Sequence, residues 1–346
     1  MPVVDYKTEV QLGEVLGGSG HLTRWAKKQK KDDSSSATLP SRKDSNAIFK
    51  ANKHGNPALS ELEVAMAAVW KACVREQSAN YYLVTEGEET KGVLSDKLTN
   101  WQPMQSTILD NSEHKEQLAT LLVMCYCLEE DDLHKNNIGT AEIGGKTQVI
   151  KIDHDMSFYQ SLSSTSGNRR PYVRVKDEDR FVVSARDMTN FPVLTDANIH
   201  YWPTTYRFFE GSQGYGRDKA LRNQFRELKD DIDFTKYKFK AFEDFAEIKP
   251  ENVKKALEDH LGSSKPELVS MIMGAFIARQ AEIRCVLLAT PEAQRSLGKE
   301  LIYDNPLFAA LETGSFKYIN LSNYKNEITM MNELNQNECY RRGFIK

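Results

Sequence analysis

The spacing of apolar residues changes near residue 100, and this change limits the folds open to the chain. Before it, short strand-like runs alternate with glycine turns and one helix. After it, apolar residues recur mainly at helical spacing. Residues 1–100 therefore predict a small antiparallel sheet with one helix, and residues 101–346 predict a mainly helical lobe with a C-terminal helical extension. We expect an α+β fold with two lobes.

Two strands and a long loop are predicted in the first fifty residues. Tyr6–Leu16 is strand-like and runs into a turn of three glycines and one serine. Residues 26–46 are charged, rich in serine and almost free of apolar side chains, so they predict a mobile loop. Ala47–Ala51 predicts the strand that follows this loop.

A helix and a hairpin complete the predicted small lobe. Apolar residues from Leu62 to Cys73 recur at helical spacing, with Ser60 placed as the N-cap. Tyr81–Glu86 and Lys91–Leu98 are strand-like runs on either side of a short turn.

The second part begins with a strongly apolar helix over His114–Glu130, and a strand pair follows around a Gly144-Gly145 turn. Residues 157–195 read as irregular. The clearest later helices are predicted at 215–230, 250–261 and 265–290.

Between that helix and the strand pair lies the segment Asp132-Leu133-His134-Lys135-Asn136-Asn137. It matches the kinase catalytic-loop spacing D-L-x-x-x-N and equally the spacing D-x-H-x-x-N. A tight loop would turn Asp132 and Asn137 toward one metal-phosphate centre. Asp132 would then orient and deprotonate an acceptor hydroxyl, and Asn137 would bind magnesium. The alternative is a solvated acidic helix end followed by an Asn-rich turn.

Two further carboxylates follow the second strand of the pair, in Asp153-His154-Asp155. Either is a candidate metal ligand. We favour Asp153, because it follows the apolar strand directly, although both can serve one metal. No glycine follows Asp153, and an ordinary acidic turn is the alternative interpretation.

Lys50 on the predicted strand Ala47–Ala51 is the candidate for the lysine that contacts the α- and β-phosphates of ATP. Glu63 on the next helix is its expected ion-pair partner. Glu61 lies on another side of the helix, so only one of the two glutamates can face Lys50. A solvated lysine on a strand is the alternative.

Backbone groups provide the remaining candidates for nucleotide binding. Gly17, Gly18, Ser19 and Gly20 allow backbone N–H groups to approach phosphates closely, and a plain hairpin turn is the alternative. Ser95–Leu98 is expected to read the adenine base, with Ser95 and Leu98 at its ends.

Over residues 12–160 these motifs together resemble a remote member of the protein-kinase superfamily, between protein kinases and the phosphoinositide-kinase and HipA-like branch. The chain resembles atypical effector kinases of Legionella that inositol hexakisphosphate activates. The resemblance implies ATP with Mg²⁺ or Mn²⁺ as cofactors, a protein Ser/Thr acceptor, an inositol polyphosphate regulator, and secretion into the cytosol of a host cell. No A-P-E-like anchor follows Asp153, so substrate positioning must be unusual.

A ligand with many phosphates requires several Lys and Arg side chains. We expect some basic residues of the second lobe to converge on one anion pocket, with solvated faces as the alternative. The candidates are Arg169, Arg170, Arg174, Lys176, Arg207, Arg217, Lys219, Arg222, Arg226, Lys236, Lys238 and Lys240.

Composition excludes several classes of protein. Because 46 basic residues nearly balance 49 acidic ones, nucleic acid is not an expected partner. The five cysteines form no C-x-x-C pair, and no signal peptide or membrane span is visible, so we expect a cytoplasmic monomer. A membrane-targeting segment beyond Lys346 remains an alternative, as do a phosphoinositide kinase and a non-catalytic nucleotide-binding scaffold. Ligand spacings for zinc and a G-x-S-x-G elbow are absent from the sequence.

Overall fold

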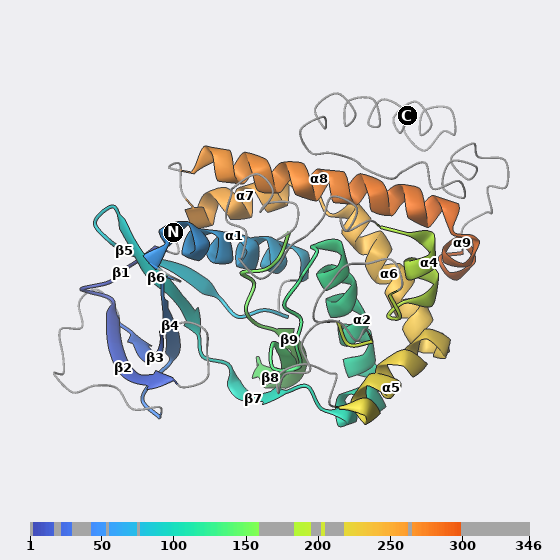
Figure 1. The fold of residues 1–346 in the computed structure, drawn as a ribbon, viewed down its shortest axis with the longest axis horizontal. Helices are drawn as coiled ribbons and strands as arrows, with labels where there is room; N and C mark the ends of the chain where they lie inside the picture. The colour runs from blue at the N-terminus through green and yellow to red at the C-terminus, as the bar shows by residue number, and fades with distance from the viewer. Residues whose placement is uncertain are drawn as a thin grey trace.

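The computed structural model has a sheet-rich lobe at one end and helices at the other, which confirms the expected α+β, two-lobed architecture (Figure 1). It describes residues 3–16, 22–29, 43–52, 55–74, 77–158, 183–194, 202–204, 218–261 and 265–298. None of the helices in these ranges is long and apolar enough to cross a membrane.

The small lobe contains one six-stranded sheet in the order β1-β5-β6-β4-β3-β2. Its strands are β1 (Val3–Asp5), β2 (Val10–Leu16), β3 (Thr23–Lys28), β4 (Ala47–Ala51), β5 (Tyr81–Glu86) and β6 (Glu89–Asp96). The β5–β6 hairpin and β4 were predicted and are confirmed. The strand that carries Lys50 therefore lies inside the sheet, between β3 and β6.

The first edge of the sheet differs from the prediction. The predicted strand Tyr6–Leu16 begins only at Val10, and a separate strand, β1, precedes it. Strand β1 pairs in parallel with β5, so the sheet is not purely antiparallel. The break has a local cause, because Asp5 Oδ1 accepts hydrogen bonds from the backbone N–H groups of Lys7 and Thr8 and closes a turn.

Strand β3 extends into the segment predicted as a loop. The loop was expected from residue 26, but β3 runs to Lys28, since Ala26 is fully buried and pairs with Ala47 of β4. On the other side of β4, the close approach of the two strands leaves room only for glycine at position 92 of β6. A Cβ at Gly92 would lie 2.1 Å from the backbone oxygen of Lys50.

Helix α1 (Pro57–Val74) packs on this sheet and begins earlier than predicted. Its first turn starts at Pro57, a residue type favoured there because its missing N–H is not needed. The side chain of Asn56 accepts a hydrogen bond from Ala58 N. Ser60 is therefore not the N-cap, and its hydroxyl donates to Asn52 Oδ1 at 2.8 Å.

The second lobe is built from helices around one large core. Its helices are η2 (Ser106–Asp110), α2 (Ser112–Cys127), α4 (Ala185–Asn190), α5 (Lys219–Glu227), η5 (Leu228–Asp230), α6 (Ile232–Glu247), α7 (Pro250–Leu261), α8 (Pro266–Ala289) and α9 (Pro291–Ser296). Helix α2 was predicted, as were α5, α7 and α8. Helix α6 was not singled out although it packs against α2, and α4 lies in a stretch read as irregular.

A second sheet connects the lobes. Strands β7 (Thr99–Pro103), β8 (Ile138–Ile143) and β9 (Lys146–Lys151) pair in that order, and the predicted β8–β9 hairpin is confirmed. Strand β7 crosses the boundary predicted at residue 100. Ser78 of the small lobe forms a parallel bridge with Lys151 at the end of β9. This bridge joins the end of β9 to the segment that precedes β5.

Candidate active site

Lys50 of β4 connects two carboxylates that come from different parts of the chain. Its Nζ atom donates to Glu63 Oε1 of α1 at 2.7 Å and to Asp153 Oδ1 at 2.8 Å. Asp153 lies 103 positions later in the sequence, beyond the end of β9. The lysine side chain is 15% exposed and that of Glu63 is 4% exposed, so this contact is largely shielded from water.

Burial and charge act in opposite directions on this group. Burial by itself would lower the pKa of Lys50, but the carboxylates of Asp153 and Glu63 raise it well above its ordinary value. Burial is the largest cause that raises the pKa of Glu63 to about 7, although Lys50 acts to lower it. Lys50 is therefore a fixed cation at the junction of the two lobes.

Glu61 is directed away from this cluster. Its Oε1 accepts a hydrogen bond from Thr90 Oγ1 at 3.1 Å, and its Oε2 lies 3.0 Å from Lys265 Nζ. Of the two glutamates considered from the sequence, Glu63 faces Lys50.

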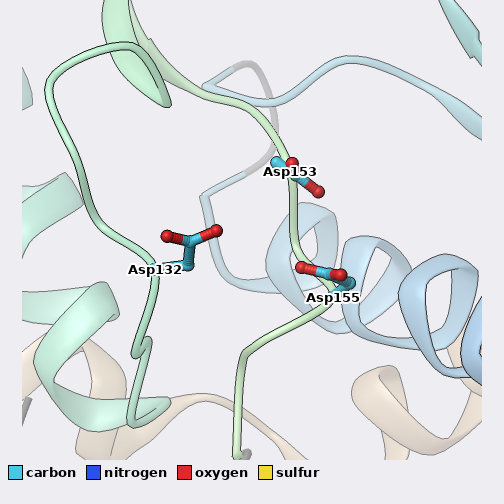
Figure 2. Close-up of side chains that lie close together, drawn as sticks. All are labelled: Asp132, Asp153 and Asp155. Carbon is cyan, nitrogen blue, oxygen red and sulfur yellow. The ribbon is translucent and has the colours of Figure 1, made fainter. Parts of the chain in front are cut away.

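Asp132, Asp153 and Asp155 converge on one space (Figure 2). Each offers a carboxylate oxygen, and the three oxygens lie within 4.8 Å of one another. Burial, together with the charges of Asp153 and Asp155, raises the pKa of Asp132 to about 7. Three oxygen donors in one space suit a hard divalent cation such as Mg²⁺, which would also offset their mutual repulsion.

Hydrogen bonds close the segment from Asp132 to Asn137 into a tight loop. The backbone N–H of Asn137 donates to the oxygen of His134 at 2.8 Å, and its side-chain amide donates to the oxygen of Asp132 at 3.0 Å. Ile152 N donates to Asn137 O at 2.9 Å, which joins this loop to the segment carrying Asp153. With its amide nitrogen already bonded, Asn137 has its Oδ1 atom to offer a metal.

Three buried residues of the site were not found by sequence reasoning. Tyr81 Oη accepts a hydrogen bond from the backbone N–H of Asp153 at 3.0 Å. Lys151 pairs with Glu130 at 3.0 Å, and both side chains are fully buried. The only signal in the sequence is positional, because Glu130 and Lys151 each stand two residues before a candidate aspartate.

The nucleotide-binding predictions have mixed outcomes. Gly17–Gly20 lie outside the described residues, but the strands that flank them end beside the lysine, since Leu16 pairs with Thr23 and Thr23 pairs with Lys50. Ser95 lies within β6 with strands on both sides, so its backbone is not available to a base. Leu98 follows the end of β6 and remains the candidate.

The described basic candidates differ in their burial and contacts. Lys238 is buried in α6 and donates to the backbone oxygen of Thr189, which removes it from the anion-binding candidates. Arg226 donates to the oxygen of Thr204, and Lys240 pairs with Asp244. Lys236 is exposed on α6, Lys219 is exposed on α5, and Arg222 is half-buried there. Arg169, Arg170, Arg174, Lys176, Arg207 and Arg217 lie outside the described residues.

The fold and these contacts define a two-lobed α+β arrangement with a cation and three carboxylates between the lobes. Neither a protein-family model nor a curated protein matches the chain. Among solved structures, the chain is similar to the Helicobacter pylori proinflammatory kinase CtkA, with 12% identity and a TM-score of 0.48. The match covers 87% of this chain and 100% of that one.

Proposed function

We propose that this protein is an ATP- and magnesium-dependent kinase that transfers the γ-phosphate to a protein Ser/Thr hydroxyl. The observation that supports this most strongly is the contact of Lys50 with both Glu63 and Asp153, beside a third carboxylate on the loop at Asp132. Phosphoryl transfer needs a cation at the phosphates, oxygen ligands for metal, and one carboxylate at the nucleophile. Each of these has a side chain here.

In the proposed reaction, Asp132 accepts the proton of the acceptor hydroxyl as the new O–P bond forms. The bond between the γ-phosphorus and its bridging oxygen breaks, and ADP leaves with that oxygen. Lys50, held in place by Glu63, stabilises negative charge on the α- and β-phosphates. Asp153, Asp155 and Asn137 would hold magnesium, which supplies charge neutralisation between the β- and γ-phosphates when it is bound.

A lipid acceptor is the second candidate, and His134 favours it. The His134 imidazole lies beside the catalytic carboxylate, with its Nε2 atom 3.9 Å from Asp132 Oδ1. This histidine gives the D-x-H-x-x-N form of the loop that phosphoinositide kinases share. Burial lowers the pKa of His134, so near neutral pH it is an uncharged neighbour of Asp132.

We further propose that inositol hexakisphosphate regulates the kinase by binding to basic residues of the second lobe. Among the described candidates, Lys219, Arg226, Lys236 and Lys240 are exposed and Arg222 is half-buried. A polyphosphate would require these to act with neighbours from 169–217.

The test is transfer of labelled γ-phosphate from ATP to a generic basic protein, and in parallel to phosphoinositide vesicles, with and without inositol hexakisphosphate. Asp132→Ala is the catalytic control, and Asp110→Ala, at an exposed aspartate, is its matched control. Label on protein that is lost only in Asp132→Ala supports the proposal. Label on vesicles alone favours the lipid kinase, and nucleotide binding without transfer to either acceptor contradicts both.

A further inference from the structure

The backbone of Asp153 adopts a conformation that its residue type disfavours. Its φ angle is 63°, in the left-handed region that residues with a Cβ atom rarely occupy. No glycine is present at this turn, so the surrounding structure must hold the conformation in place. The direction of the Asp153 carboxylate depends on it, because the chain turns there on leaving β9.

Side chains bind Asp153 at its N–H, at its C=O and at its carboxylate. Its N–H donates to Tyr81 Oη at 3.0 Å, and its C=O accepts from Lys151 Nζ. Its carboxylate accepts from Lys50 Nζ at 2.8 Å. Two of these three contacts are therefore made to the backbone, and they determine where the carboxylate points.

Both side chains that bind the backbone are themselves fixed. Tyr81 is 5% exposed on β5, and its ring packs edge-on against His154 with centroids 5.4 Å apart. Lys151 is fully buried and pairs with Glu130, and burial by itself would lower its pKa while Glu130 raises it. A buried ion pair adds little net stability over apolar side chains of similar size, so stability alone is a weak reason for its presence.

Glu130 extends this support to the other candidate aspartate. Its Oε1 atom accepts a hydrogen bond from the backbone N–H of Asp132 at 3.2 Å. Its Oε2 atom accepts from Ser157 Oγ at 2.6 Å. The Lys151–Glu130 pair therefore connects the backbone of Asp153 to the backbone of Asp132.

We propose that Tyr81 and Lys151 are positioning residues that hold the backbone of Asp153 in its left-handed conformation and so direct its carboxylate to a bound metal. The metal-binding role of Asp153 is part of the function proposed above, and this inference rests on it. Groups that orient a metal ligand typically change metal affinity or activity about 10–100-fold when they are removed.

The test compares Tyr81→Phe with Tyr82→Phe, its neighbour on β5, whose hydroxyl lies 3.4 Å from Asp96 instead. Mn²⁺ binding in the presence of ADP is measured by electron paramagnetic resonance of the free ion, and thermal unfolding is measured without metal. We expect Tyr81→Phe to weaken Mn²⁺ binding about tenfold, with an unfolding midpoint close to that of Tyr82→Phe. Unchanged Mn²⁺ affinity in Tyr81→Phe would overturn the inference.

Lys151 is tested by Lys151→Met together with Glu130→Met, because the single change would leave a buried carboxylate without its cation. Lys146→Met, at the exposed start of β9, is the matched control. We expect the double variant to fold and to bind Mn²⁺ about tenfold more weakly, whereas wild-type affinity would overturn the role of the pair. If the wild-type protein binds Mn²⁺ but transfers no phosphate, the proposed function fails while the Mn²⁺ results still decide this inference.

Discussion

Lys265, the residue before α8, pairs with Glu61 of α1 at 3.0 Å. Glu63, two residues further along the same helix, pairs with Lys50 of the small lobe. Helix α1 is thus bound by the sheet through one glutamate and by the C-terminal helices through the other. Helices α7 and α8 lie along α1 in Figure 1, and α7 packs against it.

Replacing Lys265 with Met should have little effect on stability. The Lys265 side chain is 40% exposed, and an ion pair of this kind contributes about 0–1 kcal/mol. Packing of α7 holds α1 in any case. Urea unfolding of the variant and the wild type measures the difference, and a loss of several kcal/mol would show that the Glu61 contact holds the helix.

Replacing Lys50 with Met should remove most phosphotransfer. Loss of one preorganised cation or donor typically lowers kcat about 10²–10³-fold, and Glu63 and Asp153 would also repel each other without the lysine. Single-turnover transfer measures the rate, with Lys146→Met as the control at an exposed lysine. A rate within about twofold of wild type, which is under about 0.5 kcal/mol, would remove Lys50 from the site.

Asp155→Asn should stabilise the metal-free protein at pH 8. Its carboxylate is one of three within 4.8 Å, and it raises the pKa of Asp132 and of Glu63 by repulsion. Removing one of three like charges relieves that repulsion. Differential scanning calorimetry with and without Mg²⁺ tests this. Without metal, we expect the variant to unfold at a higher temperature than the wild type. On adding Mg²⁺, we expect its unfolding temperature to rise by less than that of the wild type. If Mg²⁺ raises the unfolding temperature equally in variant and wild type, Asp155 does not bind the metal and Asp153 is the favoured ligand.

The pH dependence of transfer should follow Asp132. A carboxylate that acts as a base must be ionised, and the pKa of Asp132 is raised to about 7 by burial and by its acidic neighbours. Activity should therefore fall as the pH drops through about 7 at low Mg²⁺. Saturating Mg²⁺ should move this fall in activity to lower pH, because the cation favours the ionised form of Asp132.

The raised pKa of Asp132 should also make the stability of the protein depend on pH. Because the folded pKa of Asp132 lies above the unfolded value of about 3.9, its contribution is present below that value and is lost as the pH rises toward about 7. Asp132→Asn should remove this dependence in metal-free calorimetry. In the activity measurements, a fall in rate that occurs at the same pH with and without Mg²⁺ would argue against a metal beside Asp132.

Local patterns in the sequence predicted most residues of the candidate site. Lys50 stands on a short apolar strand, Glu63 follows at helical spacing, and Asp132 and Asn137 share one tight loop. Each of these features depends on neighbours only a few positions away, so periodicity and turn chemistry predict it. The parallel pairing of β1 with β5 depends on residues about 80 positions apart (Val3 and Leu83), and no local pattern predicts it.

What the sequence by itself determined is therefore the type of most elements and the polar residues that follow them, such as Asp153 after β9, because hydrophobic spacing and loop chemistry are local. Only the tertiary structure decided that Lys238 is buried and that Tyr81 contacts the backbone of Asp153. These outcomes depend on which surfaces pack together. A buried polar group finds its partner through that packing, and the partner can lie anywhere in the chain.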